Sequence, residues 1–359
     1  MKSVYAPALV VLVLMIAFSL VVLASHEWDI MTFVVERPDD IPPEQTWGVG
    51  YDGQMAYAIA TKPFQIDEAL DHPAYRYQRI LYPLMAYALS FGSAGLVPWS
   101  LLIINLAAAT GTTLILGYLL TKRGASPWWA MVAVLSFNYL ISVRMDLAEP
   151  VAYGLALAGL LAFERERFAL AIMAFAAAAL AKEVVLAFPL ALGMWTLWKK
   201  RWLLASAILI GTIGPYFAWA GVIRLWIGQS PFSMPGISPI FLPFAGLFKM
   251  EGFEAKVMVC IWTMAPAILA GTMALWQLAR RPRGAHSADA LLLLANVAMV
   301  AIAPVATWAD PVAILRMGIG VVISVLIWMS AHWPRRLAIT GALWLPSLLL
   351  AVLLPGFLR

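Results

Sequence analysis

The sequence is poor in charge and in cysteine. Only 12% of its 359 residues are Asp, Glu, Lys or Arg, and Cys260 is the one cysteine. A single cysteine excludes an intramolecular disulfide and a cysteine-rich metal site. The four histidines are scattered, without H-E-x-x-H spacing, so nothing predicts a histidine-based zinc centre. We expect no cofactor, although carboxylates leave room for a divalent metal.

Apolar residues, in contrast, are abundant. They make up 63% of the chain and form long runs broken by short polar stretches. This pattern predicts an all-α, polytopic membrane protein, because a spanning segment must satisfy its own backbone hydrogen bonds. A β-barrel would need alternating apolar and polar residues instead. The first run, 7–24, lacks a clear small-x-small cleavage site and is expected to stay as a helix.

The apolar runs predict about eleven membrane helices. Their ranges are 7–24, 98–121, 127–143, 150–163, 167–181, 184–198, 202–222, 258–279, 288–307, 311–331 and 337–356. The helices at 150–163 and 167–181 are shorter than the roughly 20 residues of a full span. We divide the chain into an N-terminal module, 1–222, and a C-terminal module, 223–359.

The charges predict how the helices are oriented. The basic stretches TKRG, ERER, KKR, RRPR and RR fall on one side, which with Lys2 carries 13 basic and 3 acidic residues. The other side carries 11 basic and 16 acidic residues. The basic side, with the N-terminus, should be cytoplasmic. The net charge of +5 therefore reflects topology and does not indicate a nucleic-acid partner.

The opposite, outer side holds two long segments, 25–97 and about 223–257. Within 25–97 we expect two short helices lying at the membrane surface. One runs from Asp52 to about Thr61, and the other from Asp71-His72-Pro73 to about Ser90. An Asp stands at each start, where an N-cap belongs, and Pro73 suits a first helical turn.

Asp52, in "GYDGQ", is the first candidate for chemistry. It either caps its helix or serves as a general base at the outer face, and the two roles are compatible. Gly53 would let another group approach the backbone closely. Tyr51, Gln54 and Tyr57 supply hydroxyl and amide groups suited to a polyhydroxylated substrate.

The stretch "RMDLAEP" is the second candidate. Asp146 and Glu149 are three residues apart, so on a helical turn they would share a face, with Arg144 nearby. The alternative is a solvated loop that ends two helices. Placing charged side chains this close to the hydrocarbon of the membrane costs free energy, so such side chains commonly have a function.

Two further stretches place charge inside apolar sequence. Lys182-Glu183 marks a tight outer turn, either as a self-neutralising pair or with Lys182 near an anionic ligand group. Asp310 and Arg316 belong to "WADPVAILRMG". Arg316 either snorkels outward or faces inward, where its forked donors suit a phosphate or diphosphate.

The last candidate is "HPAYRYQRILYP". Arg76 and Arg79 lie one turn apart and attract either lipid headgroups in general or one particular lipid phosphate. All five stretches lie on the same outer face of the predicted topology, which favours a common cavity. The side chains assigned to substrate binding are Tyr51, Gln54, Tyr57, His72, Arg76, Tyr82, Glu183 and Asp310.

These features together resemble the GT-C superfamily of membrane glycosyltransferases, which use polyprenyl-phosphate sugar donors. "GYDGQMAYAIA" is similar to the W-D-x-x-x-Y-x-x-I-A pattern of the GPI mannosyltransferases, with Tyr51 in place of Trp and Tyr57 displaced by one position. "RILYPLMAYAL" is similar to their Y-P-L stretch. The segment from "RMDLAEP" to "AKEVVL" resembles their acidic helix start and the short hairpin that follows. The resemblance covers roughly residues 1–200.

The resemblance implies an inverting transfer from a lipid-phosphate sugar to a lipid or glycan acceptor at the extracytoplasmic face of the cell membrane. Asp52 would be the base, and Asp146 or Glu149 a second acidic site. The cations that would hold the donor phosphate are Arg79, Arg144, Lys182 and Arg316. Membrane lipids are the remaining expected partners.

Three other interpretations stay open on the sequence. A transporter or lipid flippase also places charges inside the membrane, but it predicts internal repeats, and the halves show no self-similarity. An acyl- or phosphotransferase acting on envelope lipids would have the same location. A non-catalytic assembly factor would bind a partner through the outer loops.

Overall fold

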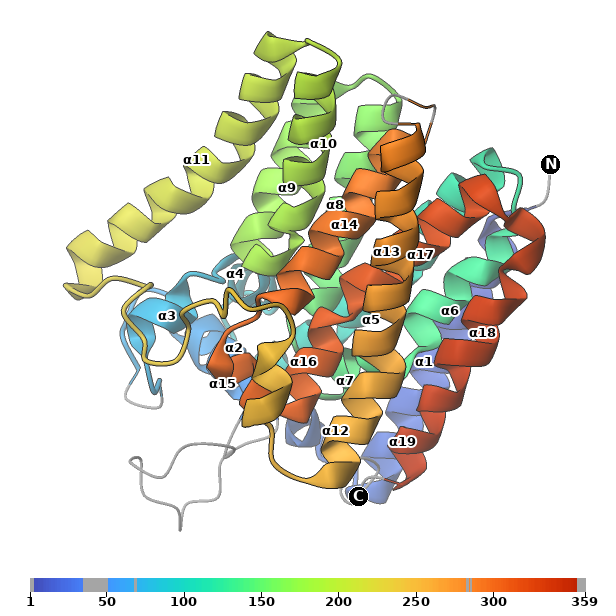
Figure 1. Cartoon of the computed structure of the whole chain (residues 1–359). Helices are drawn as coiled ribbons and strands as arrows, with labels where there is room; N and C mark the ends of the chain where they lie inside the picture. The colour runs from blue at the N-terminus through green and yellow to red at the C-terminus, as the bar shows by residue number, and fades with distance from the viewer. Residues whose placement is uncertain (1–2, 35–50, 68–69, 282–283, 285, 354–359) are drawn as a thin grey trace.

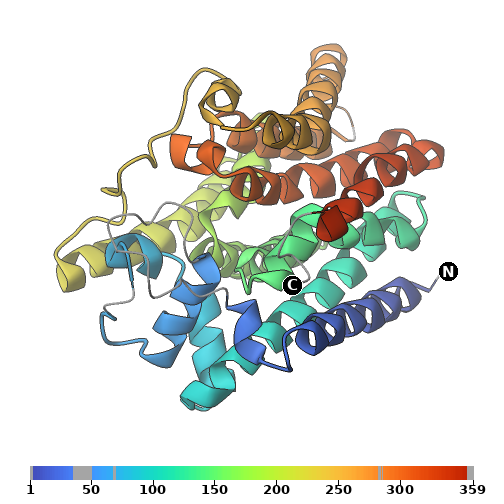
Figure 2. The same ribbon diagram turned by 90° about the horizontal axis from the view of Figure 1, so that it is seen from below.

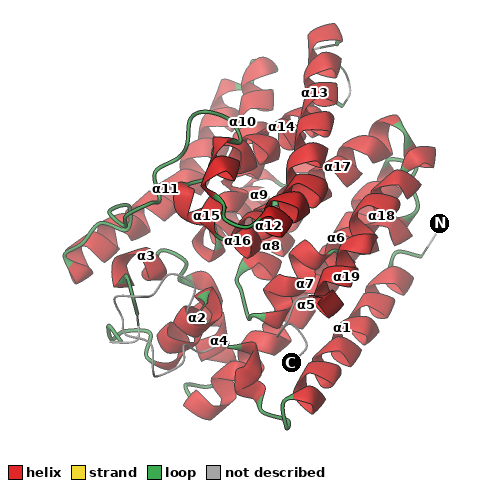
Figure 3. Cartoon of the chain, turned by 60° about the horizontal axis from the view of Figure 1, so that its bottom comes forward, coloured by secondary structure: helices red, strands yellow, loops and turns green. Residues whose placement is uncertain are grey.

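The structure is a computed structural model that describes residues 3–34, 51–67, 70–281, 284 and 286–353. Over these residues the chain is helical and forms no strand (Figure 3). One isolated bridge joins Pro239 to Pro304. The all-α prediction is therefore confirmed for the described residues.

The helices follow the apolar runs of the sequence. Their bounds are α1 Tyr5–Ser25, α2 Asp52–Thr61, α3 Pro73–Tyr77, α4 Leu81–Leu89, α5 Val97–Lys122, α6 Ala130–Leu135, α7 Phe137–Arg144, α8 Glu149–Glu164, α9 Phe168–Ala181, α10 Ala187–Trp198, α11 Trp202–Ile227, α12 Phe253–Val259, α13 Ala265–Arg280, α14 Ser287–Ala301, α15 Val305–Ala309, α16 Pro311–Met317, α17 Ile319–His332, α18 Ala338–Trp344 and α19 Leu349–Leu353. A 3₁₀ turn, η5 (Glu183–Leu186), precedes α10, and a π-helical turn, η7 (Cys260–Met264), joins α12 to α13.

Five helical segments of the described chain are long and apolar enough to cross a membrane. They are Tyr5–Ser25, Ala94–Lys122, Trp202–Ile227, Phe253–Arg280 and Pro311–His332. Large apolar side chains stay exposed on them; on α11, Leu203 is 90% and Leu225 89% exposed. Exposed apolar surface of this extent fits a membrane protein. Eleven spans remain a prediction.

Several helices predicted as continuous are interrupted. The run 127–143 breaks at Ser136, whose hydroxyl donates to the carbonyl of Ala133 and whose backbone is extended. The surface helix predicted from Pro73 to Ser90 divides into α3 and α4, because Pro83 has no N–H to offer the carbonyl of Arg79.

The C-terminal runs divide for related reasons. The run 288–307 ends at Ala301, ahead of Pro304, and α15 follows. The run 311–331 breaks at Gly318, between α16 and α17. The run 337–356 is divided by a 3₁₀ turn that contains Pro346, and its positions 354–356 lie outside the described residues.

The molecule has two distinct ends. The short elements α2, α3, α4, α15 and α16 gather at one end, and the turns that follow α8, α10 and α13 lie at the other (Figure 1). At that far end Arg123 binds Glu164 at 2.6 Å and Asp289 at 2.7 Å. Seen from below, the middle helices lie between α1 on one side and α13–α17 on the other (Figure 2).

Helix length differs between the core and its flanks. The central helix α8, packed against α5 and α9, has 16 residues, about 24 Å at the usual rise. The helices α5 and α11 have 26 residues each, about 39 Å. The end of the molecule that carries α2–α4 therefore adjoins a central helix that is shorter than its neighbours.

Candidate functional site

An ion-pair network of eight side chains occupies the end that carries α2–α4. It joins four carboxylates to four cations, and its members are Asp52, Asp71, Glu149, Glu183, Arg76, Arg79, Lys182 and Arg316. We call it the Asp52 network. Its formal charges balance, and its members come from segments as far apart as α2 and α16.

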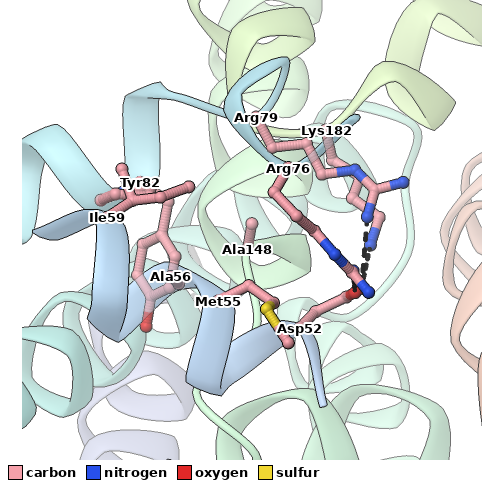
Figure 4. Close-up of a pocket in the computed structure, with 10 residues that line it drawn as sticks. Asp52, Met55, Ala56, Ile59, Arg76, Arg79, Tyr82, Ala148 and Lys182 are labelled. Carbon is pink, nitrogen blue, oxygen red and sulfur yellow. Dashed lines mark hydrogen bonds and ion pairs between the residues drawn. The ribbon is translucent and has the colours of Figure 1, made fainter. Parts of the chain in front are cut away.

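Asp52 is the centre of the network, because all four cations contact it. Figure 4 shows three of them, Arg76, Arg79 and Lys182, with Asp52. Its Oδ1 accepts from Arg76 Nη1. Its Oδ2 lies 3.1 Å from Lys182 Nζ and 3.3 Å from Arg79 Nη1. Arg316 Nη1 lies 3.4 Å from the same oxygen. The Asp52 side chain stays 23% exposed, so it is reachable despite this enclosure.

Glu149 is the second carboxylate at the centre of the network and is more buried than Asp52. Its Oε1 lies 3.0 Å from both Lys182 Nζ and Arg316 Nη1, and its side chain is 3% exposed. Lys182 and Arg316 therefore each bridge Asp52 and Glu149. These four groups link α2, α8, α16 and the break after α9.

Two carboxylates hold the outer arginines. Glu183 receives two hydrogen bonds from Arg79, at 2.7 and 3.0 Å, and Asp71 receives two from Arg76, both at 2.7 Å. Such two-point pairing fixes the plane of a guanidinium. Tyr75 also accepts from Arg79 at 2.6 Å.

Local backbone features deliver these side chains. Lys182 stands in an extended break, since α9 ends at Ala181 and η5 begins at Glu183. Glu149 is the first residue of α8, with Pro150 in the first turn. The predicted tight turn at Lys182-Glu183 is confirmed, but its two charges pair with other partners instead of neutralising each other.

Gly53 lets α2 approach the 144–149 turn. A Cβ at this position would collide with the carbonyl oxygen of Met145. The close approach predicted for Gly53 is thus confirmed. The predicted N-cap role of Asp52 is wrong: the N-cap is Tyr51, and Asp52 lies within the first turn with its carboxylate bound to the cations. Asp71 likewise does not cap α3, whose N-cap is His72, although Pro73 opens the helix as expected.

The network controls the protonation of its acids. Burial alone would raise the pKa of Asp52, but the surrounding positive charges, that of Lys182 foremost, outweigh burial and hold this pKa well below its ordinary value. Burial would also raise the pKa of Glu183, but the charge and hydrogen bonds of Arg79 lower it to about 2. Both groups are anionic at neutral pH.

A pocket opens beside Asp52. Its cavity volume is about 30 Å³, and about 350 Å³ when the adjoining space open to solvent is counted. Its polar side consists of Asp52, Arg76, Arg79 and Lys182, and its apolar side of Met55, Ala56, Ile59, Tyr82, Pro83 and Ala148. The pocket therefore suits a ligand with an anionic group beside an apolar portion.

Asp146 stands apart from the Asp52 network. The chain closes α7 with a Schellman motif, in which Leu147 N–H donates to Ser142 and Asp146 N–H to Val143. This motif puts Asp146 in the left-handed region, at φ 47°, fully buried. The expected helical turn shared with Glu149 is therefore wrong. Burial raises the pKa of Asp146 well above its ordinary value, opposite to Asp52.

Arg144 and Tyr82 also turn to structural partners. Arg144 Nη1 donates to the carbonyl of Thr32 at 2.6 Å. Tyr82 borders the pocket, and its hydroxyl donates to Leu101 at 3.1 Å and accepts from Asn105 at 2.8 Å. Their proposed roles in binding phosphate and substrate remain predictions.

The other predicted substrate contacts lie on, or directly next to, elements that carry members of the network. Gln54 and Tyr57 are half-buried on α2, and His72 is exposed at the start of α3. Tyr51 and Asp310 contact each other through the Tyr51 hydroxyl. The sequence pointed to neither Asp71 nor Tyr75 as a partner of the arginines; the only available signal was the spacing of Asp71 five residues before Arg76.

Among the described residues, no group of three or more His, Cys, Asp or Glu side chains could hold a metal ion. The carboxylates of the Asp52 network instead face the side chains of arginine and lysine.

No protein-family model, curated protein or solved structure matches the chain. The assignment to the GT-C superfamily therefore stays a prediction from motifs, and what the site does has to be argued from its own geometry.

Proposed function

We propose that the chain is an integral membrane glycosyltransferase of the GT-C type. It transfers a sugar from a polyprenyl-phosphate donor to an acceptor hydroxyl at the extracytoplasmic face, with inversion. The observation that carries the proposal is the position of Asp52: a carboxylate still 23% exposed beside a pocket, enclosed by four cations from distant segments.

The cations suit a phosphate leaving group. Arginine and lysine neutralise the charge that develops on a phosphate as its bond to the sugar breaks. In the structure the positive charges of these cations are matched by the four carboxylates of the network. A donor phosphate would take over part of the hydrogen bonds that Arg76, Arg79 and Lys182 now make to Asp52.

This exchange would also activate the base. A carboxylate whose pKa is held far below the reaction pH accepts a proton poorly. When the donor phosphate draws cations away from Asp52 and adds its own negative charge, the pKa of Asp52 rises. The acceptor oxygen then attacks the anomeric carbon, its proton passes to Asp52, and the carbon–oxygen bond to the phosphate breaks, releasing polyprenyl phosphate.

The membrane placement belongs to the same proposal. The chain crosses the membrane about eleven times, with the end around Arg123 and Glu164 on the cytoplasmic side. The Asp52 network then lies on the outer side, with α2–α4 at the membrane surface. A lipid donor would reach the pocket from within the bilayer.

The test is sugar transfer in membrane vesicles containing the purified chain. Radiolabelled polyprenyl-phosphate mannose, glucose and galactose are supplied in turn, with membrane lipids and glycans as acceptors. General base catalysis contributes about 10²–10⁴-fold, so Asp52→Asn should reduce transfer at least 100-fold. Asp67→Asn is the matched control, because Asp67 pairs with Lys62 outside the network, and it should transfer at the wild-type rate.

Two results would overturn the proposal. Unchanged transfer by Asp52→Asn would exclude the assigned base. Movement of the intact lipid between leaflets without loss of its sugar would identify a flippase instead.

A further inference from the structure

We propose that Tyr51 and Asp310 are positioning residues that hold the guanidinium of Arg316 against Asp52 and Glu149. This inference rests on the proposed function for the reaction that the positioned arginine serves. It assigns the two residues an indirect role, in place of the direct contact with substrate hydroxyls that the sequence predicts.

Tyr51 covers the face of the guanidinium. The Cζ of Arg316 lies 4.8 Å from the centroid of the Tyr51 ring, a distance at which a cation is attracted to an aromatic face. The edge of the same guanidinium meets the carboxylates, with Nη1 at 3.4 Å from Asp52 and 3.0 Å from Glu149. Arg316 is thus held by its face and by its edge.

Asp310 fixes the Tyr51 ring in turn. The Tyr51 hydroxyl donates to Asp310 Oδ2. The other oxygen, Oδ1, accepts from the backbone N–H of Val312 at 2.8 Å, which makes Asp310 the N-cap of α16. Arg316 lies on this same helix, so Tyr51 contacts α16 at two points.

Tyr51, Asp310 and Arg316 are thus joined by contacts that link the start of α2 to α16. Tyr51 directly precedes Asp52 in the chain, and it contacts both the start of α16 and the arginine that α16 carries. Movement of α16 along its axis would break one contact or the other. Tyr51 and Asp310, which we call the clamp, therefore set the position of Arg316 relative to Asp52. Neither of the two is among the residues that line the pocket.

The first readout needs no substrate. Carbon-13 NMR of aspartate-labelled protein in micelles, with Asp52→Asn to assign the signal, measures the pKa of Asp52. Loss of a neighbouring opposite charge raises a carboxyl pKa by about 1–3. Arg316→Gln and Tyr51→Leu should both raise the pKa of Asp52 by about 1. Arg76, Arg79 and Lys182 still face Asp52 and outweigh the opposing negative charge of Glu149, so the pKa stays under its ordinary value.

A double-variant cycle separates positioning from a general structural effect. In the Arg316→Gln background, Tyr51→Leu should add no further rise in the pKa. Tyr51→Phe keeps the ring and loses only the bond to Asp310, so its rise should be smaller. Tyr118→Leu is the control, because it removes a tyrosine ring stacked on Arg165 outside the Asp52 network, and it should leave the pKa unchanged.

Transfer from polyprenyl-phosphate mannose gives the second readout. Tyr51→Leu and Arg316→Gln should each lower kcat/KM about tenfold or more, without a tenfold further loss when combined. A wild-type pKa of Asp52 in Tyr51→Leu, or an equal rise with and without Arg316, would overturn the clamp. If the wild-type chain transfers no sugar while the NMR cycle behaves as described, the proposed function fails and the clamp stands.

Discussion

At the scale of single residues, the position of each charged side chain in the site depends on partners of opposite charge. Lys182 and Arg316 are each shared between Asp52 and Glu149, so neither cation would keep its position if both acids were lost. Burying an ion is costly unless partners surround it. The side chains most enclosed here, Glu149 at 3% and Arg316 at 7% exposure, each have two neighbours of opposite charge.

Glu183 makes the stability of the site depend on pH. Its pKa is lowered to about 2 in the folded chain, against an ordinary value of about 4.3 when unfolded. The stabilisation is therefore complete above the unfolded value and disappears as pH falls toward the folded value. The unfolding midpoint of the wild-type chain in micelles should drop between about pH 5 and pH 2, and Glu183→Gln should flatten part of this drop.

The control for this titration is Glu251→Gln, because Glu251 is exposed and outside the Asp52 network. Its midpoint should follow the wild-type curve at every pH. A Glu183→Gln curve that also follows the wild type would show that the pair with Arg79 does not stabilise the fold.

At the scale of elements, α2 is placed by one close contact. Gly53 faces the carbonyl of Met145 at a position where even a Cβ does not fit. Asp52 precedes Gly53 in the first turn of α2. The distance between α2 and the turn after α7 therefore also sets the position of the Asp52 carboxylate.

Gly53→Ala should therefore displace α2. Overpacking a close contact costs about 1–3 kcal/mol, which exceeds the gain of about 1 kcal/mol from alanine in a helix. We expect net destabilisation of up to about 2 kcal/mol and reduced transfer. Gly111→Ala, in α5, is the matched control, because its added Cβ meets nothing within 4 Å. Denaturant unfolding of both variants measures the difference; equal midpoints would contradict the close packing.

The positions and ends of single helices could be predicted from the sequence, because they depend on neighbouring residues. The apolar runs located the helices, and the proline and glycine rules explain most of their breaks. The convergence of Asp52 with Lys182, Arg316 and Glu149 was expected from a shared outer face and is confirmed by their distances. Asp146 was misplaced because periodicity assumes a continuing helix, whereas a left-handed aspartate ended it. The Tyr51–Asp310 contact spans 259 positions, and no local pattern reports it.

At the scale of the whole molecule, charge divides between two ends. Arg123, Glu164 and Asp289 form ion pairs at one end, and the Asp52 network lies at the other, with α8 reaching from Glu149 to Glu164 between them. Whether the two ends face opposite sides of a membrane is a separate question of topology.

Cysteine labelling answers that question, because Cys260 is the one native thiol. In a Cys260→Ser background, Leu242→Cys should react with a membrane-impermeant maleimide on intact cells. Lys199→Cys should react only after permeabilisation. Both positions are exposed, so access to the reagent decides the outcome. The reverse pattern would invert the proposed orientation, and labelling of both from outside would contradict it.

The short reach of α8 has a consequence for side reactions. At about 24 Å it falls short of the roughly 30 Å hydrocarbon thickness of a bilayer, while the neighbouring helix α5 exceeds it. In the proposed placement the Asp52 carboxylate would thus stand below the headgroup plane, where water is scarce. An activated sugar held there would meet few competing nucleophiles, so depth in the membrane would suppress its hydrolysis.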